Sequence, residues 1–524
     1  MTLAARTVAI ADEAAMARLA EDVALLLRPG MTLALKGDLG AGKTTFTRAL
    51  LRAIADDPSL DVPSPTFSLM QPYELPRLAV AHVDFYRLEG RAEADVLGLD
   101  DWSARGAVLA EWPERVGLAP GPGIAEVAIA FGAGPTARSV TLTADPAFIA
   151  AFDRGAAIRA FLAASGWPGG ARRFLQGDAS TRRFERVTAA GGRRAVLMDA
   201  PRQPDGRPVR NGRAYSTLAR LAEDVRPFVA IGTALRARGL SAPELYAAVL
   251  EQGLLLVEDL GDDKIVDARG AVIPERYAAA VDLLAHFHSE PMPRRVPLPG
   301  GAAYELPEFD GDVMEIELSV FLDWYLPAFA SPAGEAERQR FTALWRPLFA
   351  RLGAAERHWL LRDFHSPNLM WLADRPGIRA VGLIDYQDAL IGPTAYDLVS
   401  VLQDARTPVP ADLEAELFAR YVAARRATAP EFDEARFREA YVISSAQRAV
   451  RILGVFTRLR DRDGKPGYIR QIPQLKDYLA RTLAHPVLAE LARWLGERGM
   501  FAPAAPEPDA ADAGGGPLCG ERRA

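Results

Sequence analysis

Apolar positions in the first 148 residues alternate between helical and strand spacing. Residues 11–27 carry apolar side chains at three- and four-residue intervals, which predicts a helix. Short apolar runs predict strands at 31–35, 78–85, 107–111 and 126–131. A second helical segment follows the first of these runs, and strands that alternate with helices predict an α/β sheet covered on both faces.

A second set of elements begins near residue 152. The pattern predicts a helix at 152–167 and a strand, turn and strand at 172–187. It also predicts a strand at 193–201, a helix at 228–238 and a strand that runs into a polar turn at 254–263. From Pro274 onward the chain reads as mostly helical, except for two short apolar runs at 369–385. We therefore predict an α/β domain at 1–148 and an α+β domain at 152–500. The Pro-, Ala- and Gly-rich segment 501–524 is predicted to be disordered.

Composition narrows the class of protein. Hydrophobic residues make up 49% and charged residues 25% of the chain, and its net charge is -6. These values predict a soluble globular protein without the broad basic surface that direct, non-specific nucleic-acid binding requires. Cys519 is the single cysteine, which excludes an intrachain disulfide and a thiolate metal site. The N-terminus lacks signal-peptide character and no apolar run is long enough to span a membrane, so we expect a cytoplasmic location.

The sequence GDLGAGKTT (37–45) lies between a predicted strand and a predicted helix. It has the GxxxxGK[ST] spacing of a phosphate-binding loop, in which glycines turn backbone N–H groups toward phosphates, a lysine neutralises charge and a hydroxyl ligates Mg²⁺. The alternative is an ordinary glycine turn before a helix. The chain has only five lysines, which makes one at this place informative. The residues predicted to bind ATP here are Gly37, Asp38, Gly40, Ala41, Gly42, Lys43, Thr44 and Thr45.

Two acidic residues stand where predicted strands meet loops. Asp84 lies at the end of the apolar run at 78–85, and Glu111 ends the run at 107–111. A P-loop enzyme needs a carboxylate that holds Mg²⁺ and a group that orients the attacking water. Each carboxylate taken singly is more often a solvated strand-end residue, but their shared position favours a functional role. Thr66 is either a switch threonine or a turn-capping threonine.

Four motifs in order, GDLGAGKTT, SPTF (64–67), HVDFYRL (82–88) and EWPERV (111–116), give residues 1–145 a clear resemblance. This part resembles the TsaE-type ATPases of the bacterial machinery that makes threonylcarbamoyladenosine in tRNA. The resemblance implies an α/β P-loop NTPase fold. It also implies that the ATPase acts through partner subunits of the threonylcarbamoyltransferase complex, of the TsaB and TsaD type.

The same resemblance implies roles for particular residues. Lys43 would contact phosphate and Thr44 would ligate Mg²⁺, while Thr66 would belong to a switch loop. Asp84 and Glu111 would serve metal binding and hydrolysis, with Glu111 as the catalytic residue.

The sequence LRDFHSPNLMW (361–371) carries a second candidate site. Asp363 and Asn368 have the D-x-x-x-x-N spacing of a kinase catalytic loop, in which the aspartate accepts a hydroxyl proton and the asparagine binds Mg²⁺. A predicted hairpin and the apolar-Asp step GLID follow, which places Asp385 as a second metal ligand. His365 either binds substrate or satisfies loop backbone, and we favour the backbone role. Asp397 is expected to cap a helix or brace the catalytic loop.

The predicted strand that ends in VLMDAP lacks the phosphate-pairing lysine of protein kinases, because no lysine occurs between Lys43 and Lys264. An arginine also forks onto phosphate oxygens, and the candidates are Arg183, Arg193 and Arg194. The alternative is that this part of the chain binds nucleotide poorly. The segment VEDLGDD (257–263) resembles a hinge that receives adenine, with Glu258 and Leu260 as the predicted contacts.

The motifs of residues 155–495 resemble the aminoglycoside-phosphotransferase-like kinases, and most closely the anomeric kinases of N-acetylmuramate and N-acetylglucosamine. The resemblance implies a bilobal protein-kinase-like fold and transfer of the γ-phosphoryl of ATP to the C1 hydroxyl of an amino sugar. Asp363 would be the base, and Asn368 and Asp385 would hold Mg²⁺.

Three questions stay open at the level of sequence. Glu315, Glu317, Trp324 and Tyr325 either line a sugar pocket or form part of an amphipathic helix core. The acceptor of the kinase could instead be an aminoglycoside or an amino alcohol, which an acidic pocket would favour. The second domain could also be a non-catalytic nucleotide-binding module that regulates the ATPase.

Overall fold

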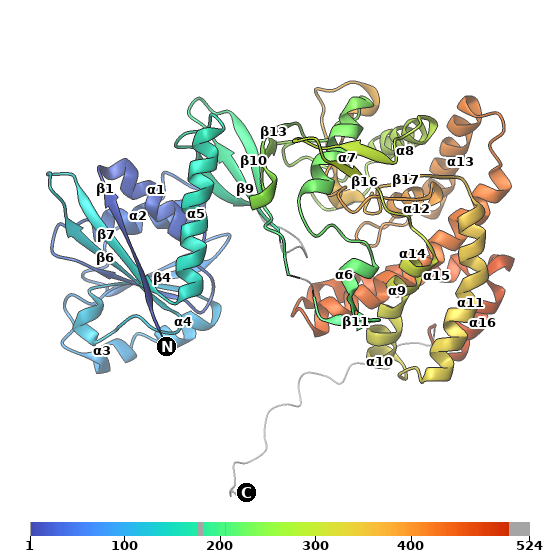
Figure 1. Cartoon of the computed structure of the whole chain (residues 1–524). Helices are drawn as coiled ribbons and strands as arrows, with labels where there is room; N and C mark the ends of the chain where they lie inside the picture. The colour runs from blue at the N-terminus through green and yellow to red at the C-terminus, as the bar shows by residue number, and fades with distance from the viewer. Residues whose placement is uncertain (1, 176–181, 205, 502–524) are drawn as a thin grey trace, which may run out of the picture. The chain divides into compact units, whose positions relative to one another are not determined.

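The computed structural model describes residues 2–175, 182–204 and 206–501 (Figure 1). It forms two compact units. The first comprises Met1–Gln203, Glu223–Val229 and Pro243–Gly261, and the second comprises Pro204–Ala222, Ala230–Ala242 and Asp262–Ala524. The predicted turn at 176–181 and nearly all of the predicted disordered tail, with Cys519, lie outside the described residues. No helix in the described part of the chain is both long and apolar enough to cross a membrane.

The first unit begins with a seven-stranded mixed sheet in the order β1-β7-β6-β2-β5-β4-β3. Its strands are β1 (Ala4–Ile10), β2 (Thr32–Lys36), β3 (Met70–Glu74), β4 (Ala79–Asp84), β5 (Gly106–Glu111), β6 (Ile124–Phe131) and β7 (Arg138–Ala144). The pairs β2–β5, β2–β6 and β4–β5 are parallel. The four strands predicted from apolar runs are confirmed to within two residues. The apolar pattern did not predict β1 and β3. These two strands lie at the edges of the sheet and are partly exposed.

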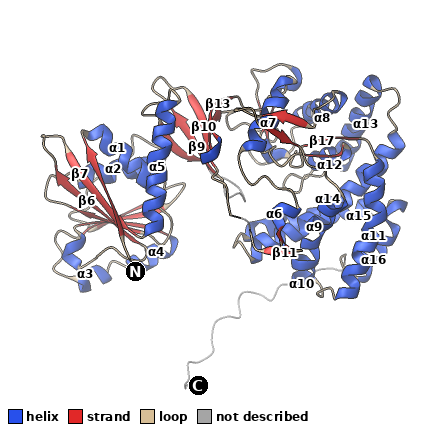
Figure 2. Cartoon of the chain, in the orientation of Figure 1, coloured by secondary structure: helices blue, strands red, loops and turns tan. Residues whose placement is uncertain are grey.

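Helices cover both faces of this sheet (Figure 2). One face packs against α1 (Glu13–Ala24), α2 (Lys43–Ala55) and the start of α5 (Pro146–Ala164). The other face packs against α3 (Arg91–Asp95), α4 (Leu99–Arg105) and the 3-10 helix η1 (Pro113–Val116). The buried centre of the sheet is therefore protected from water on both sides, as the apolar runs predicted.

Helix α5 runs through the expected junction at 148–152. It begins at Pro146, six residues before the predicted start, because Asp145 caps its N-terminus by accepting from the amides of Ala147 and Phe148. Phe148 and Phe152 belong to the core of the first sheet. Ile158 and Leu162 belong to a second core. One continuous helix thus serves two adjacent cores.

The second core of the first unit lies under a five-stranded antiparallel sheet in the order β13-β14-β10-β9-β8. Its strands are β8 (Ala171–Leu175), β9 (Arg183–Thr188), β10 (Arg194–Asp199), β13 (Leu245–Val249) and β14 (Leu254–Glu258), with the 3-10 helix η2 (Leu250–Gln252) before β14. The predicted strand, turn and strand at 172–187 and the strands near 193–201 and 254–263 are confirmed in their described parts.

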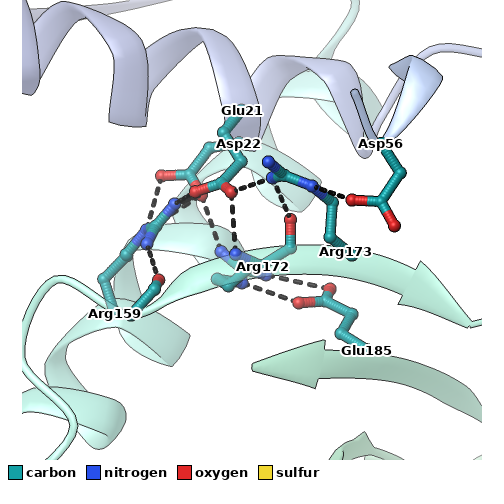
Figure 3. A network of polar contacts seen from close by, with 8 residues as sticks. Glu21, Asp22, Asp56, Arg159, Arg172, Arg173 and Glu185 are labelled. Atoms are coloured by element: carbon teal, nitrogen blue, oxygen red, sulfur yellow. Dashed lines mark hydrogen bonds and ion pairs between the residues drawn. The ribbon is translucent and has the colours of Figure 1, made fainter. Parts of the chain in front are cut away.

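A charge network joins α1 to the edge strand β8 (Figure 3). Glu21 accepts from the backbone amide of Arg172 at 2.7 Å and pairs with Arg159 at 2.5 Å and with Arg173. Asp22 pairs with Arg159 at 2.8 Å and with Arg172 at 2.7 Å. An edge strand exposes unpaired backbone groups, so the Glu21 carboxylate satisfies one of them and anchors β8 on α1.

Two further carboxylates extend the network. Arg172 forms two hydrogen bonds with Glu185 of β9, at 2.6 and 2.9 Å. Arg173 pairs at 2.7 Å with Asp56, the C-cap residue of α2. The helix that starts at Lys43 therefore ends on a residue bound to β8, and these elements form one continuous body within the first unit.

The second unit is mostly helical, as predicted (Figure 2). Its helices include α6 (Tyr215–Leu218), most of α7 (Arg226–Ala237), α8 (Pro274–Ser289), α9 (Gly311–Val320), the π-helix Phe321–Tyr325, α10 (Leu326–Phe329), α11 (Glu335–Ala354), α12 (Ala395–Leu402), α13 (Ala411–Thr428), α14 (Glu434–Asp461), α15 (Ile472–Thr482) and α16 (Ala489–Glu497). Its 3-10 helices are η4 (Ser366–Asn368), η5 (Gly377–Ala380), η6 (Pro466–Gln471) and η7 (Pro486–Leu488).

Short antiparallel strand pairs interrupt these helices. The pairs are β11 (Pro208–Arg210) with β12 (Arg213–Ala214), β15 (Arg295–Pro297) with β16 (Ala303–Glu305), β17 (Arg357–Leu360) with β20 (Leu390–Pro393), and β18 (Leu369–Trp371) with β19 (Val381–Leu383). The pair β18–β19 is the predicted hairpin around Pro376-Gly377. Asn368 directly precedes this hairpin, and Asp385 lies two residues after its end.

Candidate active sites

The loop at 37–42 connects β2 to α2 and requires glycine at defined places. Gly37 has a φ of 149°, and a Cβ at this position would lie 2.4 Å from the carbonyl oxygen of Ile129. Gly42 has a φ of 113° directly before the first residue of α2. Both conformations disfavour other residues, so the loop lies close to β6 and still turns directly into the helix N-terminus.

Lys43 is held inside this loop. Its Nζ donates to the carbonyl oxygens of Gly37 at 2.7 Å and Asp38 at 3.1 Å, and it lies 3.6 Å from the centroid of the Trp112 ring. Burial lowers the pKa of Lys43, while the charges of Glu111 and other carboxylates oppose that shift. The ammonium therefore has a defined position at the start of α2. Gly40 is exposed at the loop tip, Ala41 is buried, and Thr44 and Thr45 are half-buried in the first turn of α2.

Asp84 and Glu111 are neighbours across two parallel strands. They are register partners at the ends of β4 and β5, and Glu111 is also the register partner of Leu35 in β2. Both carboxylates are buried, with 2% of each residue exposed. The carboxyl ends of parallel strands meet at one edge of a sheet, so both acids stand at the edge where β2 enters the loop.

Each of these acids has polar partners. Glu111 lies 3.1 Å from Nε2 of His82 and accepts from the Thr47 hydroxyl at 3.5 Å. Asp84 accepts from the backbone amide of Tyr86 at 2.9 Å and from the Ser64 hydroxyl at 3.2 Å. The hydroxyl of SPTF that reaches Asp84 is thus that of Ser64. Thr66 is half-buried in the turn that follows.

The second site brings Asp363, Asn368 and Asp385 together in the second unit. The Asn368 side-chain amide donates to the Asp363 carbonyl oxygen at 3.0 Å and to an Asp385 carboxylate oxygen at 3.5 Å. The backbone amide of Ile384 donates to the Asn368 carbonyl oxygen at 3.1 Å, which fixes the two loops to each other. Gln387 donates to Asp385 at 2.9 Å.

Two residues of this site have strained backbone. Arg362 has a φ of 71° and Asp385 a φ of 59°, in the left-handed region that side chains other than glycine rarely adopt. Asp397 stabilises the first of these turns by accepting from the amides of Leu361 at 2.6 Å and Arg362 at 2.9 Å. Burial raises the pKa of Asp397 to about 7, although these two backbone hydrogen bonds oppose the shift. Asp397 therefore braces the catalytic-type loop.

A buried ion pair lies beneath the same loop. Arg362 donates to Glu317 of α9, and neither side chain is more than 1% exposed. Glu317 also accepts from Gln447 at 2.9 Å and lies 3.3 Å from Nε of Arg451. Burial raises the pKa of Glu317, but Arg451 and Arg362 lower it by more. Glu317 is thus a support of the loop, because its carboxylate is bound by these side chains below the surface.

Positive charge surrounds Asp363. Burial raises the pKa of Asp363, but His365, and after it Arg451, Arg448 and Arg362, lower it below its usual value. His365 lies 3.8 Å from Asp363, and burial lowers the pKa of His365 to about 4. The histidine is therefore neutral at pH 7, and the arginines hold Asp363 ionised. A quarter of the Asp363 side chain is exposed, at 26%.

The arginines that could replace the missing lysine lie on or beside the five-stranded sheet β13-β14-β10-β9-β8. Strand side chains alternate between faces, and Ala195 and Leu197 of β10 face α5. Arg183 is the register partner of Asp199, which belongs to that face and binds Arg154 of α5. Arg193 lies over the Trp167 ring at 4.0 Å, also beside the α5 core. Neither arginine shares the opposite face of β10 with Met198.

That opposite face carries Arg194 and a further arginine, Arg186 of β9, which the sequence had not singled out. Arg186 donates to Asp259 at 2.8 and 3.2 Å, and Arg194 lies 3.5 Å from the same carboxylate. Asp259 belongs to VEDLGDD, where Glu258 ends β14 and Leu260 is buried. Both arginines therefore tie the expected hinge to the sheet.

Within the described ranges, no group of three or more His, Cys, Asp or Glu side chains could hold a metal ion by itself. Mg²⁺ is commonly bound by one or two carboxylates together with substrate phosphates. The oxygen ligands of Asn368 and Asp385, and those of Thr44 with Asp84 and Glu111, fit that cation once a nucleotide contributes its phosphates.

Comparison with known proteins identifies both parts. The model of the family described as "Threonylcarbamoyl adenosine biosynthesis protein TsaE" matches residues 10–136, and that of the "Phosphotransferase enzyme family" matches residues 171–439. A TsaE protein from Aquifex aeolicus is 38% identical over 98 residues, which are 19% of this chain and 69% of the relative. The chain belongs to both families. We call residues 10–136 the TsaE domain and residues 171–439 the phosphotransferase region.

Relatives of the phosphotransferase region are named N-acetylmuramate/N-acetylglucosamine kinases. The protein from Caulobacter vibrioides is 39% identical over 355 residues, covering 65% of this chain and 96% of the relative. The one from Pseudomonas aeruginosa is 32% identical over 330 residues, covering 61% of this chain and 86% of the relative. The matched length extends well beyond the motifs, so the predicted fusion of the two families is confirmed.

The sequence motifs did not reveal every residue that shapes these sites. In the TsaE domain, Trp112 contacts Lys43. Trp112 directly follows Glu111 and has a positive φ of 59°. In the phosphotransferase region, Glu317 lies beneath the Arg362 turn, although the sequence allowed it a place in a sugar pocket. An acidic residue between two apolar positions of a helix is a usable signal for such a buried pair, but it does not name the partner.

Proposed function

We propose that this chain is bifunctional and uses ATP and Mg²⁺ at two sites. The TsaE domain, within residues 1–148, is an α/β P-loop ATPase that supports threonylcarbamoyladenosine modification of tRNA. Residues 152–500 form a bilobal kinase that phosphorylates N-acetylmuramate and N-acetylglucosamine at the C1 hydroxyl. The observation that carries the kinase assignment is the Asn368 side chain, which contacts both Asp363 and Asp385.

Asp363 is the proposed base of the kinase. Because its pKa is lowered, it is ionised at neutral pH and accepts the proton of the sugar C1 hydroxyl as the phosphoryl group transfers. Asn368 and Asp385 are the proposed Mg²⁺ ligands, and the cation neutralises charge on the nucleotide phosphates. Asp397 and Glu317 hold the Arg362 turn, so that Asp363 keeps its orientation.

The charges near Asp363 bear on the choice of acceptor. An aminoglycoside or amino alcohol is cationic and would be favoured by acidic neighbours. Arg448 and Arg451 instead place positive charge close to the proposed base. This electrostatic environment disfavours a cationic acceptor and is compatible with a neutral or anionic sugar. The retained Asp363, Asn368 and Asp385 also argue against a non-catalytic nucleotide-binding module.

In the TsaE domain, Lys43 and the loop amides are the proposed phosphate contacts, together with Gly37, Asp38, Gly40, Ala41, Gly42 and Thr45. Thr44, Asp84 and Glu111 are the proposed Mg²⁺ ligands, with Glu111 also orienting the attacking water. Thr66 is the proposed switch residue. We expect this ATPase to be weak alone and to act with TsaB- and TsaD-type subunits of the threonylcarbamoyltransferase complex in the cytoplasm.

The two sites can be separated by two variants of the full chain. Purified protein with Mg-ATP is expected to phosphorylate N-acetylmuramate at C1. Asp363→Ala should lower this rate by about 100-fold or more, because the proton acceptor is removed. Lys43→Ala should leave it unchanged and abolish the partner-stimulated ATP hydrolysis. The assay is phosphosugar formation followed by mass spectrometry, with ATP hydrolysis measured with and without the partner subunits.

The opposite pattern would overturn the assignment of sites: sugar phosphorylation lost in Lys43→Ala and retained in Asp363→Ala. Phosphorylation of aminoglycosides or amino alcohols, without activity on either N-acetyl sugar, would show that the proposed acceptor is wrong. Full ATP hydrolysis by the protein alone would contradict the partner-dependent part of the proposal.

A further inference from the structure

Three arginines lie on one face of α14 beside the proposed base. Arg448, Arg451 and Arg458 are separated by three and seven residues, a spacing that places side chains on the same side of a helix. We call these residues the arginine face. Arg451 is linked to the catalytic-type loop, since its Nε lies 3.3 Å from Glu317, which also binds Arg362.

The charge of the arginine face is only partly neutralised. Glu317 is shared between Arg362 and Arg451. Arg448 is buried, with 3% exposed, and its Nε has no hydrogen-bond partner among the described residues. The buried Nε of Arg458 also lacks a partner in the part of the chain that the structure describes. A buried guanidinium N–H without an acceptor is costly, so an anion at this face would supply missing interactions.

Arg458 differs from the other two because it is neither fully buried, as Arg448 is, nor paired with Glu317, as Arg451 is. It is half-buried, and its guanidinium carbon lies 5.1 Å from the centroid of the Tyr215 ring in α6. With a helix rise of about 1.5 Å per residue, Arg458 lies about 10 Å from Arg451 along α14. The arginine face therefore leads away from Glu317 toward Tyr215 over a distance comparable to one sugar ring with a substituent.

We propose that Arg458 binds the carboxylate of an anionic acceptor, namely the 3-O-lactyl carboxylate of N-acetylmuramate. The inference rests on the proposed kinase function and adds a specificity-determining contact to it. A guanidinium forks onto a carboxylate in two parallel hydrogen bonds, which gives orientation as well as charge neutralisation. N-acetylglucosamine has the same ring and the same C1 hydroxyl but lacks the lactyl group, so the two sugars form a matched pair of probes.

The test compares kcat/KM for the two sugars in the full chain with Mg-ATP. Arg458→Gln should lower kcat/KM for N-acetylmuramate about 10- to 100-fold more than for N-acetylglucosamine, which corresponds to the loss of a charge-assisted hydrogen bond. The loss should appear in KM, because the lactyl group is remote from the reacting C1 oxygen. Arg458→Lys keeps the charge and should recover part of the preference.

Arg438→Gln is the matched control. Arg438 lies on the same helix, is exposed and pairs with Glu434, so its replacement removes the same charge away from the proposed face and should leave both sugars unaffected. Equal losses for the two sugars in Arg458→Gln, or no loss for N-acetylmuramate, would overturn the inference. Thermal melting of each variant separates loss of folding from loss of the contact.

The proposed function and this inference fail in different ways. A wild-type protein that phosphorylates neither sugar contradicts the function. Calorimetric binding of N-acetylmuramate that depends on Arg458 would still support the carboxylate contact in that case, whereas equal binding by wild type and Arg458→Gln would reject it.

Discussion

The Nζ of Lys43 lies 3.6 Å from the centroid of the Trp112 ring, and Trp112 directly follows Glu111. The ring that contacts the residue expected to bind phosphate therefore belongs to the chain neighbour of the residue expected to orient water. The ring and the carbonyl oxygens of Gly37 and Asp38 together hold the ammonium at the start of α2.

Replacing this ring should weaken nucleotide binding. We expect Trp112→Ala to lower MgATP affinity at the TsaE domain about 2- to 30-fold, because a cation–π contact contributes about 0.5 kcal/mol when it is exposed and about 2 kcal/mol when it is desolvated, and Lys43 is buried. Calorimetric titration with MgATP measures this affinity, and the same titration of Lys43→Ala gives the contribution of the second site, which is subtracted. Trp102→Ala is the control, since Trp102 has a comparable contact with Arg105 at 3.8 Å in α4. Unchanged or tighter binding in Trp112→Ala would show that the ring does not preorganise Lys43.

Asp385 should set the Mg²⁺ requirement of the kinase. Asp385→Asn removes a negative ligand and is expected to raise the Mg²⁺ concentration needed for half-maximal sugar phosphorylation, with a loss of rate at saturating ATP. Titration of Mg²⁺ at fixed MgATP measures both effects. Asp374→Asn makes the same chemical change at an exposed position in the hairpin turn and should behave as wild type. An unaltered Mg²⁺ profile in Asp385→Asn would remove this residue from the metal site.

Glu21 should stabilise the attachment of β8 to α1. Glu21→Ala leaves the Arg172 amide and two arginines without this carboxylate, and removing one partner of a buried ion pair costs about 3 kcal/mol. We expect faster hydrogen exchange in a peptide that covers β8 and a lower temperature for the first thermal transition. Glu13→Ala, at an exposed position of the same helix, is the control. Equal exchange in the two variants would mean that the network in Figure 3 does not hold the strand.

His365 should make stability depend on pH in acid. Its pKa is lowered from 6.5 to about 4 by burial, so the unfolded chain binds the extra proton first as the pH falls. The contribution of the neutral ring is present above pH 6.5 and is lost progressively between pH 6.5 and pH 4. The difference amounts to about 3 kcal/mol by proton linkage.

The measurement compares urea midpoints of wild type and His365→Gln across this range. The variant should gain stability relative to wild type as the pH decreases, because it has no buried ring to protonate. His286→Gln replaces an exposed histidine of α8 and should keep the wild-type profile. Parallel curves for wild type and His365→Gln would contradict the assigned pKa shift.

Many residues of both candidate sites could be predicted from short sequence segments. GDLGAGKTT and the D-x-x-x-x-N spacing are local signals, because each motif lies within about ten consecutive residues and its residue types indicate the chemistry of the loop. The apolar runs also predicted β2, β4, β5 and β6, because a strand buried on both faces must be apolar along its length. The start of α5 was missed although Asp145-Pro146 is a helix-start signal, and β1 escaped because its side chains are mostly exposed.

By itself, then, the sequence determined the two families, the order of their domains and the loop residues that we propose as phosphate and Mg²⁺ contacts. Only the tertiary structure decided which distant side chains support them: Glu317 under Arg362, Asp397 on the amides of the same turn, and Glu21 on the edge of β8. Hydrophobic periodicity tells which face of an element is buried, but it does not say which element covers that face. Polar contacts between residues that lie 35 to 151 positions apart are set by packing of the whole chain, and they become visible only when the elements are folded together.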